Sequence, residues 1–371
     1  MKTRILTTAF MFMTTFVFGR AEDTKPLRTI DTPGESNWLA ITPDSQYLLS
    51  ANEVGNQRGG VGELRLWEIA TGKLVAGPVK TVGVTASGAI SPDSTKAATG
   101  DFTGNWRLCD LKDLKEIEQG NLGSGRVDRI AFAPDSQQFV MLRADYRKKL
   151  FDPIKAGRVT YFLYSHSATD GKPAGKSLPW PRVLPAGDTA TDPHISDPAD
   201  WTFAVGPAFD KEGQPVVPTA KTVEVLEVPS DEGVCGGVMA FAISPDRKLA
   251  ASAGCNGTAV VWDYQARTVI GKPLPIGDRT HCAQRLVFSA DSRLLAVACT
   301  DGVEQGGSLV SIVEVKTRAI LAGPFKTARL DVASNMSFAF TPDGSTLAVM
   351  NNIRGEKPAN GIQLWAVPVA K

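Results

Sequence analysis

The clearest hydrophobic pattern in the chain is a short alternation that ends at a repeated turn. Apolar side chains stand five and three residues before an aspartate, as with Leu39 and Ile41 before Asp44. A period of two predicts a β-strand with one buried face. The Ser/Thr-Pro-Asp tripeptide that closes the pattern favours a tight turn, because proline presets its backbone angle and aspartate accepts hydrogen bonds from nearby N–H groups.

This strand and its turn recur along the whole chain. The turn aspartates are Asp44, Asp93, Asp135, Asp200, Asp246, Asp291 and Asp343. The copy at Asp200 is degenerate, and the long step before it predicts an insertion. Most steps are about 45 residues, the length of one four-stranded propeller blade.

Each copy continues in the same way after its turn. In the copy that contains Asp246, a second strand is expected at 249–252 and a third at 260–263. Another turn and a short fourth strand follow. Asn256 and Gly257 favour a tight hairpin turn, because both residues tolerate a positive φ.

At these residues the chain resembles the WD-repeat β-propeller family. Trp262-Asp263 is the only literal Trp-Asp pair, and the Gly-His dipeptide of well-formed repeats is missing. With three histidines in the chain, the buried Asp-His-Ser-Trp network of those repeats is not expected in seven blades. The resemblance implies an all-β fold, a seven-bladed propeller of four-stranded antiparallel blades.

The number of copies predicts seven blades. The last third strand ends close to the C-terminus, so its blade lacks a fourth strand, which residues 26–31 near the N-terminus are expected to supply. Joining the two ends in one blade removes exposed sheet edges. The alternative is a six-bladed ring in which residues 188–230 are an embellishment.

The first residues have the layout of a secretory signal peptide. Lys2 and Arg4 precede an apolar run, and Gly19 and Ala21 are small residues at the expected cleavage site. A membrane anchor is the alternative, but the run is shorter than the about 20 residues needed to span a bilayer. We therefore expect a signal peptide at 1–21, one propeller domain at 22–371, and an exported protein that is periplasmic or extracellular.

Composition supports a globular all-β protein and narrows its partners. The chain has 35 glycines and 24 prolines, as expected of many short strands joined by turns. Its net charge of +1 gives no reason to expect nucleic acid or an anionic membrane as a partner. We expect a monomer.

The motifs that carry chemistry are mostly absent. Residues 171–177, GKPAGKS, are one residue short of a phosphate-binding P-loop, and a proline follows where that loop needs a helix. His166, His194 and His281 lie in different copies without metal-ligand spacing. A calcium loop at Asp210 lacks further oxygen ligands. We therefore expect no metal and no cofactor.

Three classes of function remain. The first is a non-catalytic binding or scaffolding module for a protein or glycan partner, because blades are present and catalytic motifs are not. The second is a propeller enzyme, lactonase-like or another hydrolase, that works from the central channel. The third is a structural module of an envelope assembly. Fold alone does not decide among them.

Four of the five cysteines form two patterns across the predicted hairpins. Cys235 and Cys255 are centred on the turn at Asp246, and Cys282 and Cys299 on the turn at Asp291. In an exported protein these spacings predict cross-strand disulfides; four buried thiols are the alternative. Cys109 takes the place of the tryptophan in its repeat, so we expect a buried free thiol.

The binding surface is expected at the end of the ring that carries the variable loops. Residues six and seven before the turn aspartates begin the first strands at that end. The candidate binding residues among them are Asn37, Trp38, Asp128, Arg129, Gln284, Arg285 and Ser337. We predict that Trp38, Arg129 and Arg285 converge there on a protein or glycan, since Trp and Arg anchor interfaces. The alternative is a core Trp38 and solvated arginines.

Overall fold

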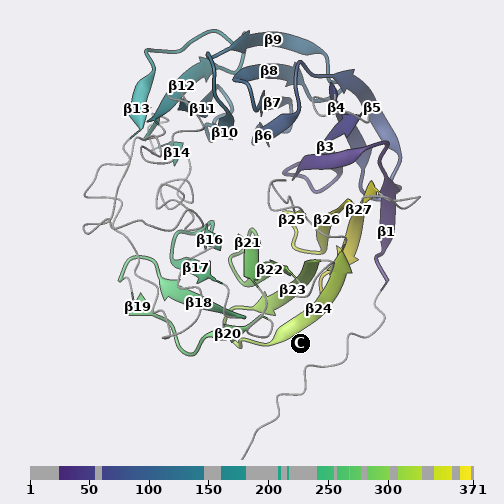
Figure 1. Ribbon diagram of the computed structural model, residues 1–371, viewed down its shortest axis with the longest axis vertical. Coiled ribbons are helices and arrows are strands. Elements are labelled where there is room, and N and C mark those ends of the chain that lie inside the picture. Colours follow the sequence, from purple (N-terminus) through teal and green to yellow (C-terminus); the bar gives the residue numbers. More distant parts are fainter. Residues whose placement is uncertain are drawn as a thin grey trace, which may run out of the picture.

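The computed structural model describes residues 25–54, 61–145, 160–180, 208–209, 215–216, 240–254, 257–266, 268–276, 282–300, 308–327, 338–352 and 360–368. Every regular element in these ranges is a β-strand, and the sheets stand around a common centre (Figure 1). The all-β fold and the antiparallel four-stranded sheets predicted from the repeats are confirmed.

The N-terminal half contains three four-stranded sheets, here named blades A, B and C. Blade A consists of β2 (Glu35–Ile41), β3 (Tyr47–Val54), β4 (Val61–Glu68) and β5 (Leu74–Lys80). Blade B consists of β6 (Thr85–Ile90), β7 (Lys96–Asp101), β8 (Asn105–Asp110) and β9 (Glu116–Asn121). Blade C consists of β10 (Val127–Phe132), β11 (Gln138–Asp145), β12 (Thr160–Ser167) and β13 (Leu178–Trp180).

Three more sheets, blades D, E and F, follow in the C-terminal half. Blade D consists of β16 (Ala240–Ile243), β17 (Leu249–Ala253), β18 (Thr258–Asp263) and β19 (Thr268–Val269), with β20 (Leu274–Pro275) also paired to β18. Blade E consists of β21 (Cys282–Phe288), β22 (Leu294–Thr300), β23 (Ser308–Glu314) and β24 (Ile320–Thr327). Blade F consists of β25 (Phe338–Phe340), β26 (Thr346–Asn352), β27 (Asn360–Ala366) and β1 (Arg28–Asp31).

Between blades C and D in the chain, the structure describes one two-stranded sheet. It pairs β14 (Ala208–Phe209) with β15 (Pro215–Val216). The degenerate repeat at Asp200, Cys235, Cys255 and the residues around them lie outside the described ranges. The count of seven blades therefore stays a prediction.

The predicted turn recurs, and the copies that begin with Ser or Thr share the same hydrogen bonds, whereas Ala133 of blade C has no hydroxyl to make them. In blade D, Ser244 Oγ donates to Asp246 Oδ1 at 2.6 Å and accepts from the Leu249 N–H at 2.9 Å. The residue after the aspartate has a positive φ in each described copy: Ser45, Ser94, Ser136, Arg247, Ser292 and Gly344. This left-handed residue lets the chain reverse in four residues.

The same turns connect neighbouring blades. The Asp93 N–H of blade B donates to Ser136 Oγ of blade C at 3.1 Å, and the Asp246 N–H of blade D donates to Ser292 Oγ of blade E at 3.3 Å. Together with the packing of first strands against one another, these bonds give a continuous order D, E, F, A, B, C.

The two ends of the chain meet in blade F. Strand β1 pairs antiparallel with β27, and Ile30 lies opposite Ile362. Both side chains are buried in a cluster that also contains Leu48 of blade A. The prediction that residues 26–31 complete the last blade is confirmed.

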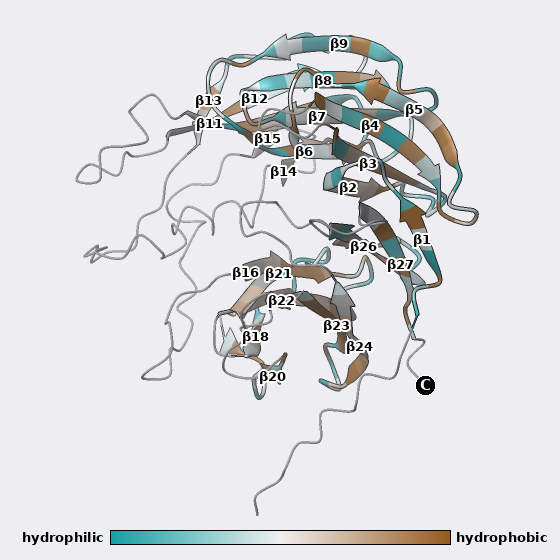
Figure 2. Ribbon diagram, turned by 45° about the vertical axis from the view of Figure 1, so that its right-hand side comes forward, coloured by the Kyte–Doolittle hydropathy of each residue, from teal (hydrophilic) through white to brown (hydrophobic). Residues whose placement is uncertain are grey.

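The core lies between the faces of adjacent blades rather than at one centre. Buried clusters join blades D and E, E and F, F and A, A and B, and B and C. Figure 2 shows apolar and polar residues interspersed along the strands, as expected of sheets that pack against neighbours and still reach solvent. Each blade therefore depends on its neighbours for burial.

The predicted disulfide between Cys282 and Cys299 is wrong. Cys282 is disulfide-bonded, but Cys299 is a buried free thiol, so the partner of Cys282 lies outside the described residues. The cause is register: Cys282 pairs with Thr300 and Ala283 with Cys299. Paired residues share a face and successive residues alternate, so the two cysteines point to opposite faces of blade E. Cys109 is buried and free, as predicted.

Candidate functional site

A β-bulge occupies the same place in the first strands of four blades. The register shifts between Ser36 and Trp38, between Thr85 and Ser87, between Val127 and Arg129, and between Ala283 and Arg285. The extra residues are Asn37, Ala86, Asp128 and Gln284. Three of the four are candidate site residues. Bulges redirect side chains and are common beside functional sites.

These bulges lie near one end of the ring, here called the loop rim. It carries the loops that lead into first strands and those that join second to third strands, whereas the Ser/Thr-Pro-Asp turns lie at the other end. Arg129 and Arg285 each directly follow a bulge at this rim. The bulge is therefore the local feature that places both arginines.

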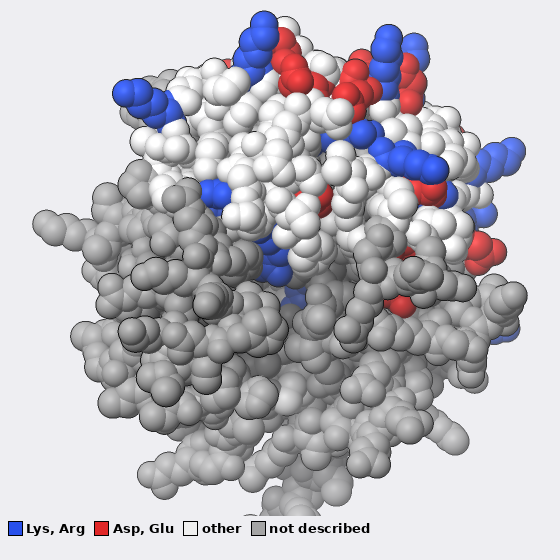
Figure 3. Space-filling view, turned by 45° about the horizontal axis from the view of Figure 1, so that its top comes forward, with Lys and Arg blue, Asp and Glu red and all other residues white. Residues whose placement is uncertain are grey.

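Arg129 and Arg285 influence each other although their blades are not neighbours. Arg129 of blade C is exposed, and Arg285 of blade E is half-buried. Burial lowers the pKa of Arg285 to about 10, and the positive charge of Arg129 contributes to the lowering. Blades F, A and B separate C from E along the described order, yet the charge of Arg129 still acts on Arg285. Figure 3 shows basic atoms in the recess at the centre of this view.

Asp128, the bulge residue of blade C, is a buried carboxylate. Arg126 forms an ion pair with its Oδ1, and Oδ2 has no hydrogen-bond partner in the described part of the chain. Burial raises the pKa of Asp128, while the charges of Arg126 and Arg129 act in the opposite direction. The equivalent residue of blade A, Asn37, likewise has a buried Nδ2 without a described partner.

Trp38 lies at the interface of blades A and B. Its indole packs so close to Gly88 that a Cβ there would lie 2.8 Å from the ring, and it contacts the core cluster of the two blades. Trp38 thus has the core position that was the alternative to a ligand contact. Ser337 lies outside the described residues, as do the surroundings of the Gln284 side chain. A ligand role for these residues stays a prediction.

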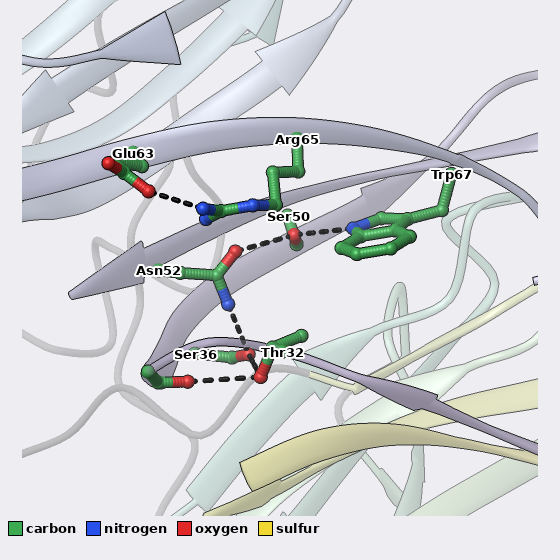
Figure 4. A network of polar contacts seen from close by, with 8 residues as sticks. Thr32, Ser36, Ser50, Asn52, Glu63, Arg65 and Trp67 are labelled. Atoms are coloured by element: carbon green, nitrogen blue, oxygen red, sulfur yellow. Dashed lines mark hydrogen bonds and ion pairs between the residues drawn. The ribbon is translucent and has the colours of Figure 1, made fainter. Parts of the chain in front are cut away.

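Blade A has a polar network at the loop rim that the sequence did not predict (Figure 4). Trp67 Nε1 donates to Ser50 Oγ at 2.9 Å, and Ser50 Oγ donates to Asn52 Oδ1 at 2.9 Å. Asn52 Nδ2 then donates to Ser36 Oγ at 2.8 Å. The network ties the second and third strands to the start of the first, which fixes the rim loop before β2.

The Trp-to-Ser part of this network also occurs in blade D. Trp262 Nε1 donates to Ser252 Oγ at 2.8 Å. The Ser–Trp half of the Asp-His-Ser-Trp network, which was not expected from the sequence, is therefore present in blades A and D. In blade A, Asn52 continues the network in place of a histidine. The network was therefore not recognisable from the positions of the histidines in the sequence.

Three exposed apolar residues, here called the ridge, stand in neighbouring loops on the loop rim of blades A and B. Val61, Val82 and Phe102 are 42%, 66% and 41% exposed. The loops that carry them touch: a Cβ at Gly62 would lie 2.2 Å from Thr81 Oγ1. The Arg126 guanidinium carbon lies 5.8 Å from the centre of the Phe102 ring, within cation–π distance.

The ridge was not among the sequence-based candidates. All three residues stand in loops or at strand ends, where the alternating pattern gives no information about exposure. One signal was available: Val82 and Phe102 are large apolar residues in the short segments that join strands. Such residues exposed together are typical of interaction surfaces.

Within the part of the chain that the structure describes, no group of three or more His, Cys, Asp or Glu side chains is arranged to hold a metal ion. The same residues include no helix with the length and apolarity required to cross a membrane.

Comparisons with known proteins agree with this geometry. The WD40 family model (WD domain, G-beta repeat) matches residues 230–263, which include the first three strands of blade D. A chain of the solved structure "Crystal Structure of Mitotic Checkpoint Complex" is similar with a TM-score of 0.58 and 14% identity, over 100% of both chains. No curated protein matches.

The family match covers one repeat of the chain, and the structural likeness shows the fold, a β-propeller similar to those of WD40 proteins. In all, 1607 chains of solved structures match, so the likeness establishes the fold and leaves the ligand open.

Proposed function

We propose that this protein is a non-catalytic module that binds a protein partner on its loop rim. WD40 propellers are generally scaffolds for protein interaction. The observation that carries the proposal is the exposed ridge of Val61, Val82 and Phe102 with Arg126 stacked beside it. Apolar and aromatic side chains next to arginine are the composition of interface centres.

The charges on the rim define the chemistry of the partner. Arg126 lies beside Phe102 of the ridge, and Arg129 and Arg285, which follow bulges at the same rim, are close enough for their charges to interact. A partner that places apolar side chains on the ridge and a carboxylate over the channel would complement both features. We therefore favour an acidic, partly apolar protein segment over a glycan. The signal-type segment at 1–21 supports a location outside the cytoplasm.

The proposal is tested by capture with matched variants. Val82→Asp combined with Phe102→Asp places two charges on the ridge, whereas Leu74→Asp combined with Val75→Asp does so on β5, where these residues are 43% and 49% exposed. We expect only the ridge variant to lose the proteins that the mature chain captures from its own exporting compartment, with unchanged melting temperature. Equal capture by both variants, or equal loss, would refute it.

The arginines provide a second arm of the same experiment. Arg129→Ala and Arg285→Ala together should weaken capture and reduce its dependence on salt, because two cations at the channel are lost. If the captured material is a polysaccharide that survives protease treatment, the partner is a glycan and the protein-binding proposal is wrong.

A further inference from the structure

A cavity of about 540 Å³ lies between the outer strands of blades B and C. None of the ridge residues lines it, so a ligand bound here would be independent of the proposed function. From blade B, Trp106, Glu118 and Gly120 line it, and from blade C, Tyr164, His166 and Gly175. Its volume is in the range of small-molecule sites.

The cavity exists because the fourth strand of blade C is short. Strand β13 pairs with β12 only from Tyr161 to Leu163. Farther along β12, the edge is covered by a separate segment, in which the Ala174 N–H donates to the Ser165 carbonyl at 2.8 Å. The chain then leaves the sheet at Gly175, where an added Cβ would meet no atom within 4 Å.

Glycines let the backbone pack closely against Trp106, which is 7% exposed. Gly120 lies opposite Trp106 across β8 and β9, and a Cβ there would stand 2.8 Å from the indole Nε1. A Cβ at Gly171 would lie 3.4 Å from the same indole. The wedge between the two blades is therefore closed at its inner end by the buried indole of Trp106.

His166 gives this cavity an unused polar atom. The side chain is 4% exposed, and its ring centre lies 4.8 Å from that of Trp106 and 5.6 Å from that of Phe139. Burial lowers its pKa to about 4, so the imidazole is neutral at pH 7. Its buried Nδ1 has no hydrogen-bond partner in the described structure. A buried polar atom without a partner is destabilising, and a hydrogen bond from a bound hydroxyl group would remove that cost.

The two charged residues that line the cavity, Glu118 and Lys172, carry opposite charges. Glu118 stands on one side, and Lys172 on the other is held 3.6 Å from Asp170. Amide and hydroxyl groups of Gln119, Asn121 and Ser165 complete the polar lining. A neutral ligand with several hydroxyl groups and an apolar ring face fits aromatic and uncharged polar groups together.

We propose that this cavity binds a neutral sugar residue, which stacks on Tyr164 and hydrogen-bonds to His166 Nδ1. The segment that resembles a P-loop forms one wall, through Gly171, Gly175 and Ser177. Its middle part pairs with β12, since Pro173 bridges His166, and it does not wrap an anion. The segment is thus a wall of a sugar site and not a phosphate loop.

The test is titration of the mature chain with glucose, galactose and N-acetylglucosamine, followed by calorimetry and by the ¹⁵N resonance of the His166 imidazole. We expect saturable binding of at least one sugar at millimolar concentration, with a shift of the Nδ1 resonance. If none of the three sugars binds at 50 mM, or if binding leaves that resonance unmoved, the proposal is overturned.

Two variants at one position localise the site. Gly175→Trp places a large side chain in the cavity without a clash, so this variant should not bind the sugar. The Gly175→Ala variant should bind the sugar with the affinity of the unchanged chain. His166→Phe keeps a ring of similar shape without the nitrogen and should weaken binding at least tenfold. Unchanged affinity in a folded Gly175→Trp variant would show that the sugar binds elsewhere. If a variant fails to fold, the ¹⁵N shift of the His166 imidazole in the unchanged chain still tests the site.

Discussion

The backbone N–H of Asp343 donates a hydrogen bond of 3.2 Å to Ser45 Oγ, and so joins the last turn of the chain to the first. The same bond connects blades B and C and blades D and E. Blades F and A therefore meet as successive blades do elsewhere. Within blade F, one pair of strands, β1 and β27, joins the two ends of the chain.

Substitution in that pair should destabilise the whole protein. Ile362→Ala removes a fully buried side chain opposite Ile30, and such deletions cost about 2–5 kcal/mol. Leu27→Ala, at a position 64% exposed beside the same strand, is the control and should have little effect. Urea unfolding measures both. An Ile362→Ala chain as stable as the control would contradict closure by β1.

The hydrogen bonds of Trp67 and Trp262 predict unequal effects of one substitution. Ser50→Ala removes the acceptor of Trp67 and also the donor to Asn52, whereas Ser252→Ala removes only the described acceptor of Trp262. Each buried group left without a partner costs about 1–3 kcal/mol, so Ser50→Ala should be the more destabilising. Equal losses in urea unfolding would show that Asn52 finds another partner.

Mass spectrometry of unreduced peptides should distinguish the free cysteines from the disulfide-bonded one. Cys109 and Cys299 should be recovered as free thiols that resist alkylation until the chain unfolds, because burial raises the pKa of each to about 12. Cys282 should be found in a disulfide-linked peptide. A peptide that links Cys282 to Cys299 would contradict the register of blade E.

The turns show what the sequence is able to predict. Ser244 and Asp246 form a local motif whose residues lie within one turn, so periodicity and turn chemistry suffice to predict them and their repeats. The pairing of β1 with β27 was predictable in the same way, because one strand was missing at one end and one was spare at the other.

Features that depend on exact register or on exposure were not predictable. The bulge at Gln284 shifts pairing by one residue, and that single residue moves Cys299 to the opposite face from Cys282. The ridge of Val61, Val82 and Phe102 arises from loops brought together by two neighbouring blades. The cavity at His166 likewise needs both blades, so neither site has a signature in one repeat.

His166 should make stability depend on pH in a defined window. Its pKa is about 4 in the folded chain, compared with about 6.5 when exposed, so the unfolded chain binds the extra proton between these values. Stability should be full above pH 6.5 and fall as the pH decreases toward 4. His166→Phe should lose less stability over that interval. Parallel curves for the two chains would show that His166 is protonated when folded.

The central claim is that a protein partner docks on the loop rim, and amide hydrogen exchange of the complex tests it most directly. With the captured partner bound, we expect slower exchange in rim loops 81–84, 101–104 and 122–126. The turns at the other end of the ring, 42–46, 91–95 and 133–137, should exchange at unchanged rates. Protection of those turns, with the rim loops unaffected, would contradict the account.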